Sequence, residues 1–379
     1  MSRALTLHTV TTPRDLRDFI AMPVEVYRDD PNWIRPLDTE RKTHLGPANP
    51  YFKHAEVRFR LVRDASGRAV GRISMQHDTM APRAGDKPEG HFGLLEAVDA
   101  EVMGLLLDDA EAWLRERGAP RVVGPYSLSV NDESGVLVEG HGLPPRVMMN
   151  YAPPWYAAAI EARGYTKAKD LLALLLDMDQ PTPPGAQRMA AQAHSIPGFS
   201  DRNFDVRVFD QELLKVRRIF NDAWSANWGF VPLTEEEVLY SGVNLKPVFE
   251  SELGRFIQID GEPIGMIVAL ADINEAIRGL DGRLWPFGWA RLLWRLKVKK
   301  PTTARIILMG LSRTWQKDLR SAALVSALIM PLVETLRRKG FKKLELSWIL
   351  EDNRPTIRLA ELFGAVVERR YRMFQKDLV

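Results

Sequence analysis

The segment near the C-terminal end of the chain constrains the fold more than any other part of the sequence. Residues 344–350 (LELSWIL) read as a strand, a short helix follows from Asn353 to Gly364, and residues 366–378 read as a closing strand. Asn is a favoured residue at the start of a helix, and Gly is a favoured residue at its end. A strand, a helix and a strand in this order indicate an α/β fold.

Composition limits the class of protein. Hydrophobic residues make up 45% of the chain and charged residues 27%, which is typical of a globular protein that is neither disordered nor membrane-spanning. The absence of cysteine excludes disulfides, thiolate metal sites and thiol catalysis, so we expect a cytoplasmic protein without a metal. We expect no signal peptide, since residues 1–30 mix charged and apolar side chains. The net charge of +3 is too small to indicate a nucleic-acid partner.

A length of 379 residues exceeds what one hydrophobic core usually serves, so two domains are expected. Both halves show the order strand, helix, hairpin, strand, helix, strand, helix and strand, and a Pro-rich segment separates them. This repeat predicts two α/β domains, each with a mixed sheet, while one large mixed sheet is the alternative. The predicted ranges are 1–179 for the first domain, 180–203 for a linker, and 204–379 for the second domain with an insert at 276–304.

Several long motifs carry a resemblance to a known family. The C-terminal strand, helix and strand resemble the tail of the GNAT acyltransferase fold, which transfers an acyl group from a thioester to an amine. The whole chain resembles a group of bacterial tandem GNAT-like N-acyltransferases that includes the bacterial ceramide synthases. The motifs that carry this likeness are Gly124-Pro-Tyr with Asn131-Asp-Glu-Ser-Gly135, Asn227-Trp-Gly-Phe-Val-Pro232, Asp272-Ile-Asn274, Gly282-Arg-Leu-Trp-Pro-Phe-Gly288 and Ser347-Trp-Ile-Leu-Glu-Asp-Asn353.

The resemblance implies that acyl-CoA lies between two splayed parallel strands, with its diphosphate at the start of the following helix. In the first half the matching loop, Ala97–Glu101, is acidic, so we expect that half to be degenerate and the second half to be catalytic. In the second half the loop lacks glycines but contains three cations that could neutralise phosphate. The implied acyl-CoA contacts are the backbone of Ile307, Met309 and Leu311, the side chains of Arg313, Lys317 and Arg320, and the helix start at Ser321.

Acylation of an alkylamine requires that the ammonium group first lose a proton. All seven histidines lie at or before His194, so a base in the second half must be a carboxylate or a water chain. GNAT proteins often place a Tyr acid seven residues after the Asn of the C-terminal motif, but that position here is Ala360. The predicted catalytic residues are Asp272, Glu351, Asn353 and Tyr371, with Glu345 as a further carboxylate and Ser347 as a second proton donor. Each of these carboxylates could instead be structural, and Asn353 could serve only as a helix cap.

The segment from Arg283 to Lys300 contains three of the ten tryptophans, and no acidic residue occurs between Arg283 and Lys317. On a helix, one apolar face would hold Trp289 and three leucines (Leu292, Leu293 and Leu296), with Arg291 and Arg295 opposite. Basic amphipathic helices of this kind bind membrane interfaces, although a core between the domains is the alternative. The predicted acceptor-binding residues are Trp224, Asn227, Trp228, Asn274, Trp285 and Trp289.

These observations together predict an N-acyltransferase on the inner face of the membrane. The donor would be a long-chain acyl-CoA or acyl carrier protein, the acceptor would be a sphingoid-like lipid amine, and the membrane surface would be anionic. A small-molecule or protein N-acetyltransferase is one alternative, against which the insert argues. A non-catalytic protein that binds acyl-CoA or lipid is the other, and it would explain the loop without glycines and Ala360.

Overall fold

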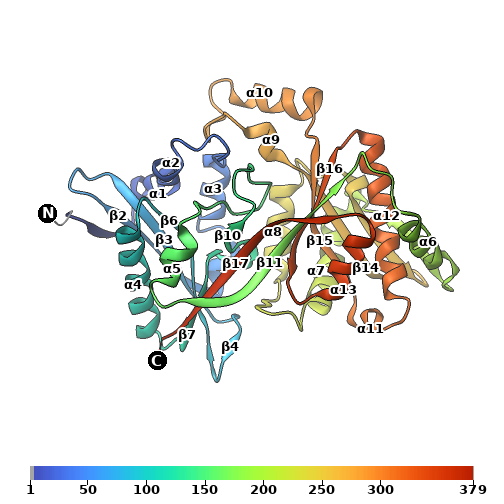
Figure 1. Ribbon diagram of the computed structural model, residues 1–379, viewed down its shortest axis with the longest axis horizontal. Coiled ribbons are helices and arrows are strands. Elements are labelled where there is room, and N and C mark those ends of the chain that lie inside the picture. Colours follow the sequence, from blue (N-terminus) through green and yellow to red (C-terminus); the bar gives the residue numbers. More distant parts are fainter. Residues whose placement is uncertain (1–3, 379) are drawn as a thin grey trace. The chain divides into compact units, whose positions relative to one another are not determined.

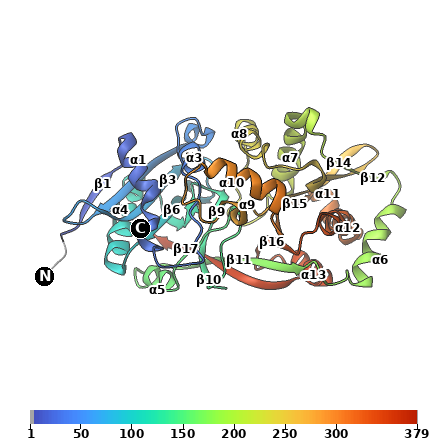
Figure 2. The ribbon, with the colours of Figure 1, turned by 90° about the horizontal axis from the view of Figure 1, so that it is seen from above.

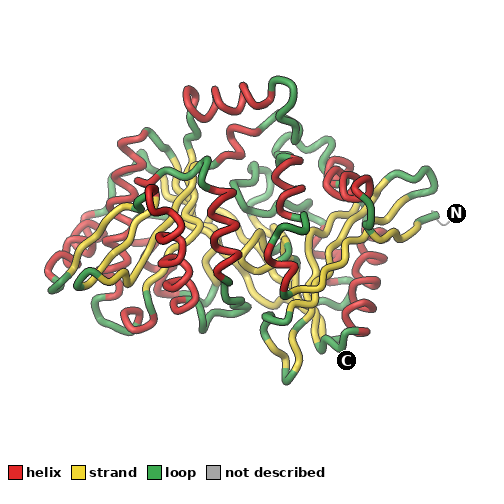
Figure 3. Tube along the Cα trace, turned by 180° about the vertical axis from the view of Figure 1, so that it is seen from behind, coloured by secondary structure: helices red, strands yellow, loops and turns green. Residues whose placement is uncertain are grey.

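The computed structural model describes residues 4–378, which divide into two compact units. Unit 1 contains residues 4–171, 277–292 and 369–378, and unit 2 contains residues 172–276 and 293–368. Figure 1 traces the chain through its elements, and Figure 3 shows that strands flanked by helices make up most of the structure. The fold is therefore of the mixed α/β class, as the sequence predicts.

Unit 1 is built on a sheet with the strand order β1-β2-β3-β6-β7-β17-β11, and β10 also pairs with β17. Its helices are α1 (Pro13–Ala21), α2 (Pro23–Val26), α3 (Asp38–His44), α4 (Ala100–Glu116) and α5 (Tyr156–Glu161), with a 3₁₀ turn at Pro50–Lys53. Its strands are β1 (Thr6–Thr9), β2 (Ala55–Arg63), β3 (Ala69–Asp78), β4 (Arg83–Ala84), β5 (Lys87–Pro88), β6 (Gly90–Ala97), β7 (Arg121–Gly124), β8 (Tyr126–Ser127), β9 (Ser129–Ser134), β10 (Val136–Glu139), the first half of β11 (Thr166–Asp177) and most of β17 (Val366–Asp377).

Unit 2 contains the second half of β11 and the strand order β11-β16-β15-β14-β13-β12. Its helices are α6 (Pro184–Gln192), α7 (Phe209–Ala223), α8 (Glu235–Leu245), α9 (Ile273–Ile277), α11 (Arg313–Gln316), α12 (Ser321–Lys339) and α13 (Arg354–Leu362). Helix α10 (Gly288–Trp294) belongs to unit 1 up to Leu292 and precedes a π-helical turn of unit 2 at Arg295–Lys299. Short 3₁₀ turns of unit 2 lie at Ala193–Ser195, Val206–Val208 and Ser251–Leu253. The other strands are β12 (Phe199–Asn203), β13 (Gly254–Ile259), β14 (Glu262–Ala271), β15 (Thr303–Leu311) and β16 (Lys343–Leu350).

The strands of unit 2 alternate between two apolar cores because successive side chains of a strand point to opposite faces. Ile267 and Ala269 of β14 pack with α12 and α13 in the larger core. Met266 and Val268, from the same strand, pack in the smaller core with α7. Figure 2 lets the reader follow these helix layers beside the strands. The central strands of unit 2 therefore have α12 on one face and α7 on the other.

Three parts of the chain differ from the domain division expected from the sequence. The expected linker at 180–203 contains α6 and β12, and α6 packs against α12. Residues 277–292 of the expected second-domain insert belong to unit 1, where Leu280 and Leu284 pack on Ile34. The C-terminal residues 369–378 also belong to unit 1, because Phe374 to Asp377 pair antiparallel with β7. These long-range pairings have no local signal in the sequence.

Candidate functional site

Two parallel strands of unit 2 separate part of the way along their length. The pairing of β15 with β16 runs from Thr303 opposite Lys343 to Ile306 opposite Leu346, and in residues 4–378 it ends there. Beyond this point β15 remains paired with β14 through Leu311, but the register skips Ile307. Such a bulge bends the strand locally. The residues predicted to contact acyl-CoA through their backbone (Ile307, Met309 and Leu311) therefore lie on the diverging part of β15.

The equivalent strands of unit 1 also separate, but the protein's own chain lies beside them. β6 and β7 pair only where Gly90 lies opposite Val122 and His91 opposite Val123. The strand β8 then runs so close to β6 that a Cβ atom on Gly93 would lie 1.4 Å from the carbonyl oxygen of Tyr126. Only glycine permits this approach. Backbone of β8 thus lies directly against β6, beyond the last residue of β6 that pairs with β7.

The helices that follow these strands begin differently in the two units. In unit 1, Asp99 caps α4, and its carboxylate accepts a hydrogen bond from the N–H of Val102 at 2.9 Å. In unit 2, α12 begins at Ser321 without a side-chain cap. A helix N-terminus attracts anions through its N–H groups and dipole, whereas a carboxylate already bound there repels them. Of these two helices, only α12 therefore begins with N–H groups that no carboxylate side chain caps, which is the arrangement that suits a diphosphate.

The three cations predicted to hold phosphate lie in different surroundings. Arg313 donates to Ser225 Oγ at 3.2 Å, and its backbone N–H donates to Asp222 at 2.8 Å, so it ties α11 to the end of α7. Arg320 forms an ion pair with Asp318 at 2.7 Å, which holds the pKa of that carboxyl at about 2. Lys317 is exposed on the same loop. Among residues 4–378, Lys317 is thus the cation of the three whose side chain makes neither a hydrogen bond nor an ion pair.

The predicted catalytic residues do not form one cluster. Asp272 is buried (4% exposed), follows β14, and accepts a hydrogen bond from the N–H of Asn274 at 3.1 Å. Glu351 is half-buried in the turn after β16. Asn353 caps α13 by accepting a hydrogen bond from the N–H of Thr356 at 3.3 Å. Tyr371 belongs to unit 1 and not to unit 2. In unit 1 it is fully buried and lies opposite Leu137 of β10.

A charged residue that the sequence analysis missed lies at the point where the strands separate. Arg305 of β15 is buried and contacts Ser347 and Glu345 of β16, the two residues that the sequence offered only as secondary candidates. Arg305 occurs in the middle of an otherwise apolar strand (TARIILMGL), and this interruption is the signal that could have identified it.

The predicted acceptor side contains an aromatic wall. Trp224 stacks on Phe220 with ring centroids 4.8 Å apart, and its ring lies against Gly310 of β15. The following loop is held by Asn221, whose side chain exchanges hydrogen bonds of 2.9 Å with the backbone of Leu233. The predicted Asn227 and Trp228 are half-buried residues of this loop. Unit 2 thus brings Trp224 to the diverging part of β15, whereas Trp285 and Trp289 belong to unit 1.

The aromatic segment from 283 to 300 is exposed. Trp285, Phe287, Trp289 and Trp294 are 82%, 79%, 50% and 55% exposed. The two faces predicted for this helix are wrong in part, because Leu292 packs on the core that contains Ile34, and Arg295 donates inward to the carbonyl of Ala276 at 2.8 Å. The outward surface therefore combines aromatic residues with Arg283, Arg291, Lys297, Lys299 and Lys300.

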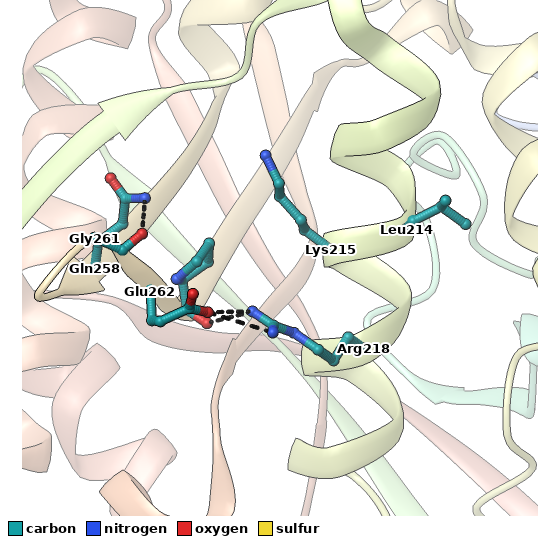
Figure 4. A pocket seen from close by; sticks show the side chains of 7 residues that line it. Leu214, Lys215, Arg218, Gln258, Gly261 and Glu262 are labelled. Atoms are coloured by element: carbon teal, nitrogen blue, oxygen red, sulfur yellow. Dashed lines mark hydrogen bonds and ion pairs between the residues drawn. The ribbon is translucent and has the colours of Figure 1, made fainter.

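A surface depression of about 400 Å³ lies elsewhere in unit 2, between α7 and the turn that joins β13 to β14 (Figure 4). Its charged side chains are paired, since Lys215 contacts Glu212 at 2.7 Å and Arg218 contacts Glu262 at 3.4 Å. It shares no residue with the predicted site. We therefore assign it no role.

Half-buried acidic side chains in unit 1 make hydrogen bonds that explain the role of one of the motifs. In the Asn131–Gly135 motif, Glu133 accepts two hydrogen bonds from Arg41, at 2.9 and 3.1 Å, which lock β9 onto α3. Burial raises the pKa of Glu133, but the opposing effect of the Arg41 guanidinium is larger, so the pKa is lowered to about 2. At the end of β6, Glu96 accepts hydrogen bonds of 2.9 Å from the hydroxyls of Tyr27 and Tyr156. These contacts connect β9 to α3, and the end of β6 to Tyr27 and Tyr156, within unit 1.

Comparison with known proteins gives a consistent result. The chain is 42% identical over 378 residues to a bacterial ceramide synthase from Caulobacter vibrioides, covering 99% of this chain and 98% of that protein. It is 41% identical to Protein YghO of Escherichia coli, and the alignment covers 98% of this chain and 95% of that protein. No family model matches the chain.

Solved structures show the same fold at low identity. A tandem GNAT protein from the clavulanic acid biosynthesis pathway aligns with a TM-score of 0.58 at 14% identity and covers 99% of both chains. A GCN5-related N-acetyltransferase from Sphaerobacter thermophilus aligns with a TM-score of 0.52 at 17% identity, covering 99% of this chain and 96% of that one. The tandem GNAT fold predicted from the sequence is confirmed.

Proposed function

The chain belongs to the family of tandem GNAT-fold acyltransferases that includes the bacterial ceramide synthase of Caulobacter vibrioides, and we propose that it N-acylates a sphingoid-like lipid amine. The donor is a long-chain acyl-CoA or an acyl carrier protein. The observation that carries the proposal is the likeness to that synthase over nearly the full length of both proteins.

The thioester site that we propose is the gap between β15 and β16 of unit 2. The N–H groups of Ile307 to Leu311 would polarise the thioester carbonyl, because oriented backbone donors stabilise the charge that develops on the oxygen. The diphosphate of CoA would lie at the start of α12, near Lys317, Arg320 and Ser321. The close packing of β8 against β6 and the Asp99 cap in unit 1 support the placement of this site in unit 2.

The amine would attack directly, without a covalent enzyme intermediate. Asp272 and Glu351 are the carboxylates proposed to assist deprotonation, and Asn353 orders the turn after β16 through its helix cap. Trp224, Asn227, Trp228 and Asn274 would contact the acceptor in unit 2. Tyr371 belongs to unit 1, and we assign it no step.

We also propose that the protein works on the inner surface of an anionic membrane. The exposed tryptophans, Trp285 and Trp289 among them, together with the surrounding lysines and arginines, have the composition of an interfacial anchor. In residues 4–378, no helix combines the length and the apolar character that crossing a membrane would require. An acetyltransferase of small water-soluble amines would have no use for this exposed surface.

The test is mass spectrometry of the products formed from sphinganine or 3-ketosphinganine and acyl-CoAs from acetyl to palmitoyl. The expected product is an N-acylated lipid that forms with long chains only. Product with acetyl-CoA alone would identify an N-acetyltransferase. Binding of acyl-CoA with no product from any pair would contradict catalysis on these lipids.

A further inference from the structure

Three buried polar side chains meet where β15 and β16 separate. Arg305 lies opposite Glu345 in the parallel register, and Ser347 is the first residue of β16 after the last registered pair. Arg305 Nε donates to Ser347 Oγ at 2.7 Å, and Ser347 Oγ donates to Glu345 Oε1 at 2.6 Å. Arg305 Nε and Glu345 Oε1 are 3.7 Å apart. The hydroxyl of Ser347 thus bridges a buried cation and a buried carboxylate.

This cluster is on the sheet face away from α12. Leu344 and Leu346 of β16 pack in the core with α12, so the alternating Glu345 and Ser347 point to the face that carries α7. The aromatic wall at Trp224 belongs to the same face. The proposed acyl acceptor would therefore approach the thioester from the side on which Ser347 lies.

Stability is a weak explanation for these charges. Their side chains are 5% (Arg305) and 1% (Glu345) exposed, and removing two charges from water costs free energy that their attraction often fails to repay. Apolar residues of similar volume would serve a core at least as well. A charged group beside a reactive gap is better explained by chemistry.

We propose that Ser347 and Glu345 shuttle a proton from the attacking amine to the leaving thiolate, with Arg305 as the residue that positions them. This inference rests on the proposed N-acyltransferase function. It supplies an acid for a half of the chain that has no histidine after His194 and has Ala360 at the family's Tyr position.

The proposed proton transfers leave the enzyme unchanged after each cycle. The neutral amine, whose ammonium form has lost a proton to solvent, attacks the thioester carbon, so the C–N bond forms and the nitrogen becomes positive. That nitrogen gives a proton to Ser347 Oγ while the hydroxyl proton of Ser347 moves to Glu345. The C–S bond then breaks, and the reverse transfer protonates the sulfur. The products are an amide and a thiol.

The test compares steady-state kinetics of the full-length protein and its variants with palmitoyl-CoA and sphinganine. Glu345→Gln and Ser347→Ala are each expected to lower kcat by about a hundredfold, the usual size of an acid–base contribution, while the KM for palmitoyl-CoA stays unchanged. Ser347→Thr keeps the hydroxyl and is expected to recover most of the activity. Ser326→Ala, which removes a buried hydroxyl from α12, is the matched control and is expected to keep kcat.

Two outcomes of these kinetics would separate a structural role from a shuttle. Wild-type kcat in Glu345→Gln, or a Ser347→Thr variant as inactive as Ser347→Ala, would overturn the shuttle. If Glu345→Gln does not unfold cooperatively, it is not correctly folded, and the comparison of kcat between Ser347→Ala and Ser347→Thr then tests the shuttle. Absence of product from the wild type would instead refute the proposed function.

Discussion

At the scale of single residues, Gly310 shows how one missing side chain shapes the proposed acceptor site. A Cβ atom there would lie 2.3 and 2.4 Å from two ring carbons of Trp224, which is itself stacked on Phe220. The ring cannot yield without losing that stacking. Gly310→Ala is therefore expected to destabilise the protein by about 1–3 kcal/mol, the usual cost of overpacking, as measured by urea unfolding.

The control for Gly310 is a glycine with room around it. In α4, the nearest atom to a Cβ on Gly104 would be 3.6 Å away, which is ordinary contact. Gly104→Ala should stabilise the protein by about 0.5–1 kcal/mol because alanine loses less backbone entropy in a helix. Equal effects of the two substitutions would contradict the close packing of Trp224 on β15.

Glu96 should make the stability of the protein depend on pH. Burial raises the pKa of Glu96 to about 7, against an ordinary value of 4.5. Between these values the folded state holds a proton that the unfolded state has lost, so this group's contribution to stability falls as pH rises from about 4.5 to 7. The free energy of unfolding of Glu96→Gln, taken relative to that of the wild type, should therefore rise by about 3 kcal/mol between pH 4 and pH 8, since each pKa unit corresponds to about 1.36 kcal/mol.

That gain would be measured by urea unfolding of the two proteins across the pH range. The glutamine side chain of the Glu96→Gln variant keeps an oxygen that accepts hydrogen bonds from the Tyr27 and Tyr156 hydroxyls, so loss of those contacts would not account for the difference. A stability difference between the two proteins that is constant with pH would show that Glu96 titrates normally.

Among single residues, the sequence predicted roles that depend on near neighbours. Asn353 was expected to cap a helix as one of its two roles, and it does cap α13. Its catalytic role stays a prediction. Arg305 and Glu96 could not be assigned from the sequence, because their partners come from other strands and helices. Pairing across a sheet sets such sites, and no local pattern encodes it.

At the scale of elements, the start of α13 separates the two roles of Asn353. Asp is as good a helix cap as Asn, whereas Ala costs about 1 kcal/mol. Asn353→Asp should therefore keep wild-type stability, and Asn353→Ala should lose about that amount in urea unfolding. If Asn353 serves only as a cap, the Asp variant will also keep wild-type kcat. A large loss of kcat in the stable Asp variant would assign Asn353 to the catalytic machinery.

The start of α12 gives a prediction about the donor. Lys317→Ala should raise the KM for palmitoyl-CoA about fivefold, the equivalent of roughly 1 kcal/mol for one exposed ion pair. A palmitoyl-pantetheine donor lacks the diphosphate, so its KM should not change. Lys246→Ala on another surface of unit 2 is the control. Equal effects of Lys317→Ala on both donors would place the CoA diphosphate elsewhere.

The sequence predicted elements with a strong local pattern better than it predicted which elements they pack against. The sequence predicted the strand, helix and strand that became β16, α13 and β17. It did not predict that residues 369–378 join unit 1, or that α6 packs on α12 in place of a linker. A Pro-rich start suggested a linker at 180–203, but Pro184 lies in the first turn of α6, where proline is compatible with a helix.

At the scale of the whole molecule, the family and the fold were both predictable, because motifs spread along the entire chain carry the resemblance. Comparison of the two units supports the proposal that unit 2 is the half that reacts. Both contain a pair of diverging strands followed by a helix, but in unit 1 the strand β8 packs closely against β6, and the helix is capped by an aspartate.

The membrane proposal makes a prediction about the whole protein. Trp285, Trp289 and Trp294 are at least half exposed and are surrounded by cations, so interfacial binding should need both the aromatic rings and the charge. Sedimentation with vesicles of phosphatidylglycerol and phosphatidylcholine should capture the protein, and vesicles of phosphatidylcholine alone should capture less. Each cation near the anionic surface adds about 1 kcal/mol, a contribution that salt weakens by screening.

A triple variant with Ser in place of these tryptophans should lose binding to the anionic vesicles, since serine provides no apolar surface to insert. Val243→Ser, at a residue of α8 that is 68% exposed, is the control for loss of an exposed apolar side chain and should bind normally. The triple variant should still acylate sphinganine dispersed in detergent, because none of the three residues lies on β15 or β16, the strands that border the thioester gap. Unchanged vesicle binding would show that the aromatic segment does not contact lipid.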